Sequence, residues 1–143
     1  MKDIRIRITG KQFIGDDTEE KMEFITEAKM SNRNGAYYFM YDESEFSGFP
    51  GCKTVLKLVD NESLKMKRIG GSTGYGAELV FSKGEKFTNS YMTPYGTFDM
   101  EVMTENFTSN FDEAKGGSIS IDYHVIFSDL AEGYNKLKID ILM

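Results

Sequence analysis

The chain has 143 residues, a formal net charge of −6 and a single cysteine, Cys52. This length suits one domain with a hydrophobic core of its own, without a disulfide framework. The acidic net charge argues against a protein whose main task is to neutralise nucleic-acid phosphates, although it does not exclude a local basic surface. The first ten residues, MKDIRIRITG, alternate charged and apolar side chains, unlike a signal peptide or a membrane helix, so we expect a cytoplasmic protein without membrane association.

The first two predicted strands follow from alternating apolar residues. Ile4, Ile6 and Ile8 alternate with polar residues, which predicts a strand that ends in a polar turn at residues 15–19. Residues 20–31 predict a second strand, whose expected inner residues are Met22, Phe24, Thr26, Ala28 and Met30. Both strands would turn one apolar face towards a common core.

The Asn34-Gly35 pair is the strongest hairpin signal in the chain. Both loop positions of a type I′ turn need a positive φ, which asparagine and glycine tolerate. A two-residue loop at this point pairs Met30 with Phe39. The same register turns three polar side chains inward at the far end of the hairpin, those of Tyr41, Glu43 and Glu45.

The middle of the chain predicts two more strands, residues 53–59 and 63–69, joined by a turn at Asp60-Asn61. Arg68 lies on the apolar face of the second of these strands. A short strand over residues 77–81 follows a glycine-rich connection.

A hairpin over residues 87–103 organises the second half of the chain. Pro94 and Gly96 predict a three-residue loop with a bulge. The returning strand alternates, and its expected inner residues are Phe98, Met100 and Val102. A change in the alternation around residues 107–111 predicts a further bulge or bend.

The last two strands show the clearest alternation. After Gly116-Gly117 the expected inner residues are Ile119, Ile121, Tyr123, Val125 and Phe127, and in the closing strand Leu137, Ile139 and Ile141. About ten short strands without a helix predict an all-β fold. We expect a single domain over residues 1–143, a closed antiparallel meander barrel of about 8–10 strands, because closure removes the edges of the sheet. A two-sheet sandwich is the alternative.

Several motifs resemble one family of small bacterial proteins, the YwiB-like family. These are YDESEFSG at 41–48, KTVLKL at 53–58, Arg68 ahead of a glycine, FSKGEKF at 81–87, YMTPYGTF at 91–98, GGSISIDY at 116–123 and KLKIDI at 136–141. The resemblance covers nearly the whole chain, and the TPYG turn with the preceding Tyr91 is its most specific part. It implies a barrel similar to the calycins and lipocalins. Members of that family are largely uncharacterised, so the resemblance implies no particular activity.

Five polar residues form the candidate ligand-binding site. Glu43 and Glu45 are expected inside the barrel on one strand and Arg68 on another, with Tyr41 and Tyr91 nearby in the pattern. An inward carboxylate and an inward guanidinium are costly unless they pair, so we expect Glu43 to meet Arg68. Such a pair fits either a structural plug at one end of the barrel or a contact with the polar group of a ligand.

The sequence does not predict an enzyme. Glu43 and Glu45 come from one strand, and no third group separates an acid from a base, so glycoside hydrolysis lacks support. Cys52 and His124 are far apart in the sequence, which disfavours a cysteine nucleophile. The run GGSTGYG at 70–76 lacks the lysine and hydroxyl of a phosphate-binding loop. We expect no metal and no other cofactor.

Two kinds of macromolecular partner are compatible with the aromatic residues near position 38. The rings beside Lys29 and Arg33 resemble a nucleic-acid stacking platform, but half of them belong to the core by parity and the net charge is acidic, so nucleic acid is not favoured. A homodimer contact is the other reading of the outward rings and methionines, Tyr38, Met40, Phe46 and Met103.

The expected function is non-enzymatic binding of a small, largely apolar ligand with one polar end inside the barrel. The alternative is a solid barrel that acts as a structural or regulatory interaction module. An eight-stranded barrel is just wide enough for either. Inward residues such as Phe24, Phe39 and Tyr123 favour filling, whereas Thr26 and Ala28 leave room.

Overall fold

The structure is a computed structural model. It describes residues 1–14, 18–42, 52–70, 77–93, 96–127 and 131–143. Within these ranges the backbone alone is described at residues 14, 18, 70, 77, 89–93, 96–98, 127 and 131–132.

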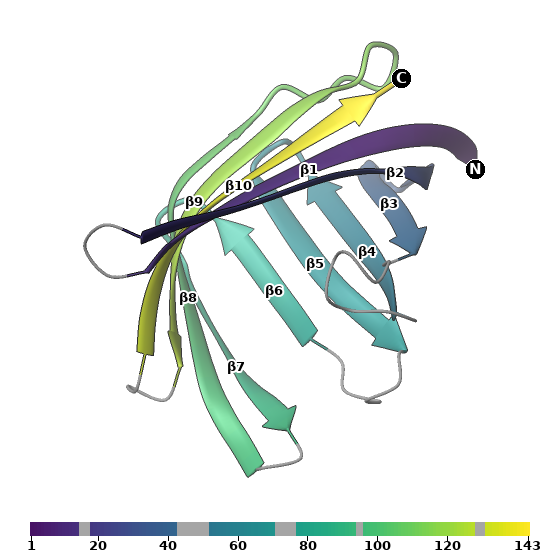
Figure 1. Cartoon of the computed structure of the whole chain (residues 1–143). Helices are drawn as coiled ribbons and strands as arrows, with labels where there is room; N and C mark the ends of the chain where they lie inside the picture. The colour runs from purple at the N-terminus through teal and green to yellow at the C-terminus, as the bar shows by residue number, and fades with distance from the viewer. Residues whose placement is uncertain (15–17, 43–51, 71–76, 94–95, 128–130) are drawn as a thin grey trace.

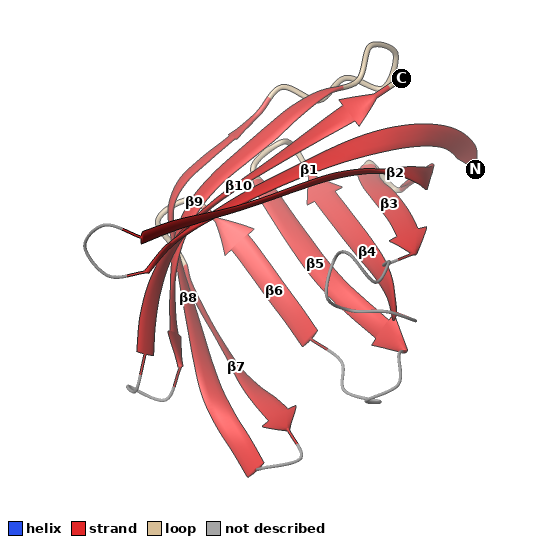
Figure 2. Ribbon diagram, viewed as in Figure 1, coloured by secondary structure: helices blue, strands red, loops and turns tan. Residues whose placement is uncertain are grey.

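Ten β-strands make up the described secondary structure, and no helix occurs among the described residues (Figure 2). The strands are β1 Lys2–Ile14, β2 Thr18–Arg33, β3 Ala36–Asp42, β4 Cys52–Val59, β5 Ser63–Gly70, β6 Ala77–Ser82, β7 Lys86–Thr93, β8 Gly96–Ser109, β9 Gly117–Phe127 and β10 Ala131–Leu142. The described part of the chain therefore contains no helix that could cross a membrane.

The strands form one antiparallel sheet that curls into a nearly closed barrel (Figure 1). Its strand order is β6-β5-β4-β3-β2-β1-β10-β9-β8-β7, so the first and last strands of the chain pair with each other in the middle of the sheet. The edge strands β6 and β7 leave one seam in the described barrel wall, and the turn between them is bonded to β8 instead: Gly84 N donates to Thr104 O at 2.9 Å. The predicted antiparallel meander barrel is confirmed, and the architecture is consistent with a calycin-like barrel.

The β2–β3 hairpin has the register that its turn predicts. Asn34 and Gly35 have φ angles of 54° and 85°, the left-handed pair that a type I′ turn requires. Met30 pairs with Phe39 as expected. Local turn chemistry therefore determines which side chains of β3 face the interior.

The β7–β8 hairpin differs from the expected three-residue loop. Thr93 pairs with Gly96, so the connection has two residues, 94 and 95, which lie outside the described residues. The hairpin itself is confirmed, but the pairing of β7 with β8 includes Gly96, which the sequence places in the loop.

The bulge in β8 lies slightly earlier than expected. Pairing with β9 shifts between Thr104 and Asn106, which leaves Glu105 as the extra residue. Thr104 and Phe107 are both buried although three positions separate them, so the change from one inward parity to the other occurs at Glu105 and not at residues 107–111.

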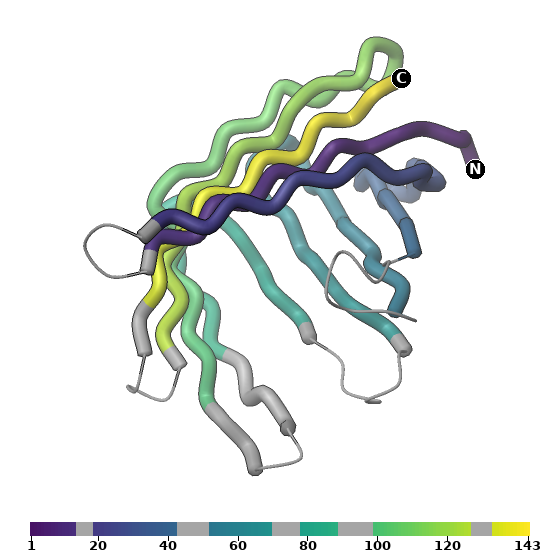
Figure 3. Tube along the Cα trace, viewed as in Figure 1, coloured from purple at the N-terminus to yellow at the C-terminus, as the bar shows by residue number. Residues whose placement is uncertain are grey.

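The barrel has two different ends. The closed end carries both chain termini and the turns that follow β2, β4, β6 and β8 (Figure 3). The other end, where the odd-numbered strands finish and the even-numbered strands begin, is called the mouth below. This division follows from the alternating strand directions of the meander.

The half of the interior next to the closed end is filled by side chains. Phe111, from the connection between β8 and β9, meets Phe39 edge to face with ring centroids 5.2 Å apart. Side chains with no exposed surface include Ile6, Phe39, Leu56, Leu64, Phe81, Val102, Ile119 and Ile139. This half supplies the hydrophobic core that holds the strands together.

Inner side chains closer to the mouth are only partly buried. These residues pack against the core without being enclosed by it: Phe24, Leu79, Tyr123, Val125 and Leu137. Met22 has the predicted inward parity, yet 41% of its surface is exposed, because it lies near the mouth. The interior is therefore solid at one end and accessible at the other.

Candidate ligand-binding site

A pocket of about 390 Å³ lies in the mouth half of the barrel. Its apolar wall includes Ile8, Phe24, Met66, Leu79 and Leu137, and its polar wall includes Tyr41, Arg68, Tyr123 and Asn135. Four charged residues also line it, Lys11, Glu20, Lys21 and Lys136. This volume lies within the range of pockets that hold small molecules, roughly 300 to 1,000 Å³. A mostly apolar lining with a few polar groups is typical of such pockets.

Tyr41 and Arg68 reach this pocket from one cross-strand row. Tyr41 of β3 pairs with Thr54 of β4, and Thr54 pairs with Arg68 of β5. All three side chains face the interior, and Thr54 is fully buried. With neighbouring strands about 4.8 Å apart, the backbones of Tyr41 and Arg68 are separated by about 10 Å, so both side chains can contact one small ligand.

Tyr123 of β9 is a further polar residue of the pocket, and it is not among the five residues that the sequence predicts for the site. It packs on Phe81 with ring centroids 4.7 Å apart. Burial raises the pKa of its phenol above the ordinary value of 10.0, and the positive charge of Arg68 acts in the opposite direction. Its inward parity was visible in the sequence, but only the folded barrel brings β9 opposite β5.

The structure does not describe the side chains of three of the five predicted site residues. Glu43 and Glu45 lie outside the described residues, and Tyr91 is described by its backbone alone, which pairs with Phe98. The expected pairing of Glu43 with Arg68 stays a prediction. Of the predicted set, the structure brings together Tyr41 and Arg68.

Tyr123→Phe should make stability less sensitive to alkaline pH. Because the native pKa of Tyr123 is raised above the unfolded value of 10.0, the folded state holds the phenolic proton more tightly. This contribution is fully present below about pH 10 and is lost as the pH rises through the native pKa. Urea unfolding of both proteins at about pH 8 and about pH 11 measures the difference.

Tyr38→Phe is the matched control for that experiment, because Tyr38 lies on the outer face of β3. The wild type and Tyr38→Phe should lose stability in parallel between the two pH values, and Tyr123→Phe should lose less. Identical losses in all three proteins would show that the Tyr123 phenol is not protected by burial.

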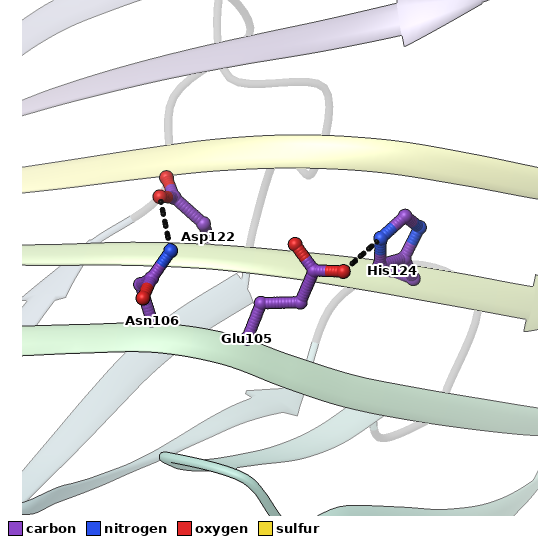
Figure 4. Close-up of polar contacts among 4 residues, drawn as sticks. All are labelled: Glu105, Asn106, Asp122 and His124. Atoms are coloured by element: carbon purple, nitrogen blue, oxygen red, sulfur yellow. Dashed lines mark hydrogen bonds and ion pairs between the residues drawn. The ribbon is translucent and has the colours of Figure 1, made fainter.

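Cys52 and His124 do not form a catalytic pair, because they lie on opposite faces of the barrel wall. Cys52 is buried at the start of β4. His124 is on the outer face of β9, where its Nε2 is 2.7 Å from Glu105 Oε1 (Figure 4). Among the described residues, no three histidine, cysteine or acidic side chains gather in a way that could hold a metal ion.

The outer residues expected at a homodimer contact are only partly placed. Tyr38 and Met40 are half-buried on the outer face of β3, and Phe46 lies outside the described residues. Two cations approach the Tyr38 ring, Arg33 at 5.8 Å and Lys57 at 5.7 Å from its centroid. A homodimer through this face stays a prediction.

A larger hollow of about 940 Å³ lies outside the barrel core beside the chain termini. Its wall includes Met1 and Met143, together with two exposed ion pairs, Lys29 with Asp3 and Lys53 with Asp42. Such a surface offers a ligand little protection from water. We therefore assign the candidate site to the smaller pocket inside the barrel.

Comparison with known proteins agrees with the fold and is silent on activity. The profile of a family described as a domain of unknown function, DUF1934, matches residues 6–139. The crystal structure of the YwiB protein from Bacillus subtilis is similar with a TM-score of 0.76 and 19% sequence identity, over 98% of this chain and 90% of that chain. Comparison with curated proteins gives no match. The resemblance to YwiB-like proteins is thereby confirmed, and at this identity the structural likeness concerns the fold alone.

Proposed function

Because the chain belongs to the DUF1934 family, whose description names no activity, we propose a function from the interior of the barrel itself. The protein binds a small, largely apolar molecule with one polar end, and it does so without catalysing a reaction. The pocket at the mouth is the binding site. We also propose that the protein acts in the cytoplasm, since a lone cysteine suits a reducing compartment.

The observation that supports this proposal most directly is the position of Arg68. Its guanidinium lies on the inner face of a hydrophobic barrel wall, in a pocket shared with Phe24 and Leu79. Arginine offers five donors in a fixed planar arrangement, which suits a carboxylate or phosphate. Tyr41 and Tyr123 add aromatic surface with a polar tip on two other strands. A ligand with an apolar body and one acceptor group matches this combination.

The lining of the pocket supports binding without chemistry. Among the described residues that line it there is no histidine, cysteine, serine or threonine. The hydroxyl or thiol nucleophile with a histidine base is therefore missing from this part of the wall, whose other ionisable residues include Glu20, Lys11, Lys21 and Lys136. Arg68 is suited to hold an anionic group but not to act as a base, since a guanidinium stays protonated.

Gly10→Val should abolish ligand binding without weakening the fold. Gly10 faces the pocket from β1, and a Cβ added there meets only the Met22 Cε at 3.9 Å, an ordinary contact. The two methyl groups of valine would occupy pocket volume, while valine favours a strand more than glycine does. We expect at least a tenfold loss of affinity for a fluorescent fatty acid, with an unchanged or higher thermal midpoint.

Thr9→Val is the control, because it adds a similar side chain at the neighbouring position on the outer face of β1. It should bind the probe as the wild type does. Native mass spectrometry of freshly purified wild type tests for a carried ligand in parallel. If the wild type carries nothing and binds neither a fatty acid nor its neutral alcohol, the solid interaction module becomes the better interpretation. Unchanged probe binding by Gly10→Val would place the ligand elsewhere.

A further inference from the structure

The outer face of β2, β1, β10 and β9 carries three lysines in one cross-strand row. These four strands lie side by side in the sheet (Figure 3). Lys21 of β2 pairs directly with Lys11 of β1, and Lys11 pairs directly with Lys136 of β10. Adjacent strands are about 4.8 Å apart, so three ammonium groups share a narrow strip of surface. Like charges placed directly opposite each other destabilise a sheet.

The ion pairs that Lys11 and Lys21 make are long and exposed. Lys11 lies 3.8 Å from Glu19, and Lys21 lies 3.8 Å from Glu23. All four of these side chains are about half exposed, and exposed ion pairs at this distance contribute little. Lys136 has no carboxylate within 4 Å among the residues that the structure describes.

Two acidic residues at the border of the row are engaged by other partners (Figure 4). Asp122, which pairs with Lys136 across the strands, accepts a hydrogen bond from Asn106 Nδ2 at 3.3 Å. Glu105, the bulged residue of β8, lies against His124. Glu105 is thus paired with His124, and Asp122, which lines the hollow described below, is shared between Asn106 and the lysine row.

A row of aromatic rings runs parallel to the lysine row, two residues along the strands. Phe13 of β1 pairs with Tyr134 of β10, and Tyr134 pairs with His124 of β9. Ring centroids are 5.6 Å apart for Phe13 and Tyr134 and 4.9 Å apart for Tyr134 and His124. All three are partly exposed on the outer face. Two residues along a strand correspond to about 7 Å, a separation that a ribose can bridge between a base and its phosphates.

A hollow of about 420 Å³ lies over the lysine row, and it shares Lys11, Lys21, Lys136 and Leu137 with the lining of the interior pocket. Its wall includes Arg7, Lys11, Lys21, Lys136 and Lys138. Three carboxylates, those of Glu23, Asp122 and Asp140, also line the hollow, so its five cations exceed its anions by two. An excess of positive charge attracts a compact anion, and lysine is a common phosphate ligand.

From these two rows we infer that the outer face of β2, β1, β10 and β9 binds a nucleotide. Lys11, Lys21 and Lys136 hold its phosphates, and the Tyr134 ring stacks on its base.

A free nucleotide fits this surface better than a nucleic-acid strand. Charges further away than about 8 Å are largely screened at physiological ionic strength, so a small anion senses the local lysines. A long polyanion would extend over the rest of a surface whose net charge is −6.

Calorimetric titration with ADP and with pyrophosphate, both without added metal, tests this inference. The wild type should bind both. The double variant Lys11→Gln and Lys136→Gln should lose at least tenfold in affinity for both, while Tyr134→Leu should lose affinity for ADP and keep that for pyrophosphate. Circular dichroism should show a folded protein, because removing opposed like charges does not weaken the sheet.

The matched control is the double variant Lys57→Gln and Lys65→Gln. These two lysines also pair directly with each other, on the outer face of β4 and β5. The control should bind ADP as the wild type does. An equal loss of affinity in both double variants would mean that ADP is attracted by the overall charge and not by a site at the lysine row. Absence of ADP binding by the wild type, or much tighter binding of a single-stranded oligonucleotide than of ADP, would overturn the assignment.

Discussion

Phe39→Ala should lower the free energy of unfolding by about 3 to 5 kcal/mol. Phe39 has no exposed surface and lies in the closed-end half of the barrel. It pairs with Leu56 of β4 and with Met30 of β2, and it packs edge to face on Phe111. Truncation removes the transfer free energy of the ring and leaves a cavity between strands that hydrogen bonds hold in place. Urea unfolding followed by circular dichroism measures the change.

Tyr38→Ala is the control for Phe39→Ala, because it truncates an aromatic ring one residue earlier in the same strand. Tyr38 points outward, where it contacts the cations of Arg33 and Lys57. Such contacts at exposed sites contribute about 0.5 to 1 kcal/mol, so the loss should be far smaller. Equal losses for the two variants would mean that the in–out alternation assigned to β3 is wrong.

Gly116→Ala should destabilise the protein by about 3 kcal/mol or more, because two separate costs add. Gly116 has a φ of +82°, which residues with a Cβ rarely adopt. It is also buried, and an added Cβ would collide with the backbone oxygen of Ile141 and lie 2.8 Å from Met143 Cγ. The backbone oxygen belongs to the β10 strand and cannot move without disturbing the sheet.

Gly84→Ala separates the two costs. Gly84 has a similar φ of +75°, but an added Cβ would meet nothing within 4 Å. Gly84→Ala should therefore lower the free energy of unfolding only by the cost of the unfavourable φ, about 1 to 2 kcal/mol. The difference in denaturation midpoint between the two alanine variants measures the steric term. If Gly116→Ala is no worse than Gly84→Ala, the connection between β8 and β9 does not pack against β10 in the way described.

The sequence predicts a residue of the candidate site only where the in–out alternation of its strand determines that the side chain faces the interior. Arg68 was expected inside because it continues the apolar face of its strand, and the structure places it there beside Tyr41. Tyr123 follows the same alternation, but the sequence predicts only that it fills the barrel, because a single sequence does not show which strands face each other across a barrel. Its contribution to the pocket depends on the distance between β9 and β5, which no local pattern encodes.

Local chemistry in the sequence was sufficient to determine the strands, the in–out alternation and the β2–β3 register. Each of these depends on residues that are neighbours in the chain: alternation needs a period of two, and the Asn34-Gly35 turn needs two residues that accept a positive φ. The tertiary structure alone decided the pairing of β1 with β10, the seam between β6 and β7, and the position of the bulge at Glu105. It also decided that one half of the interior is solid while the other contains a pocket. These features arise from closing a twisted sheet on itself, which brings together side chains that are distant in the sequence.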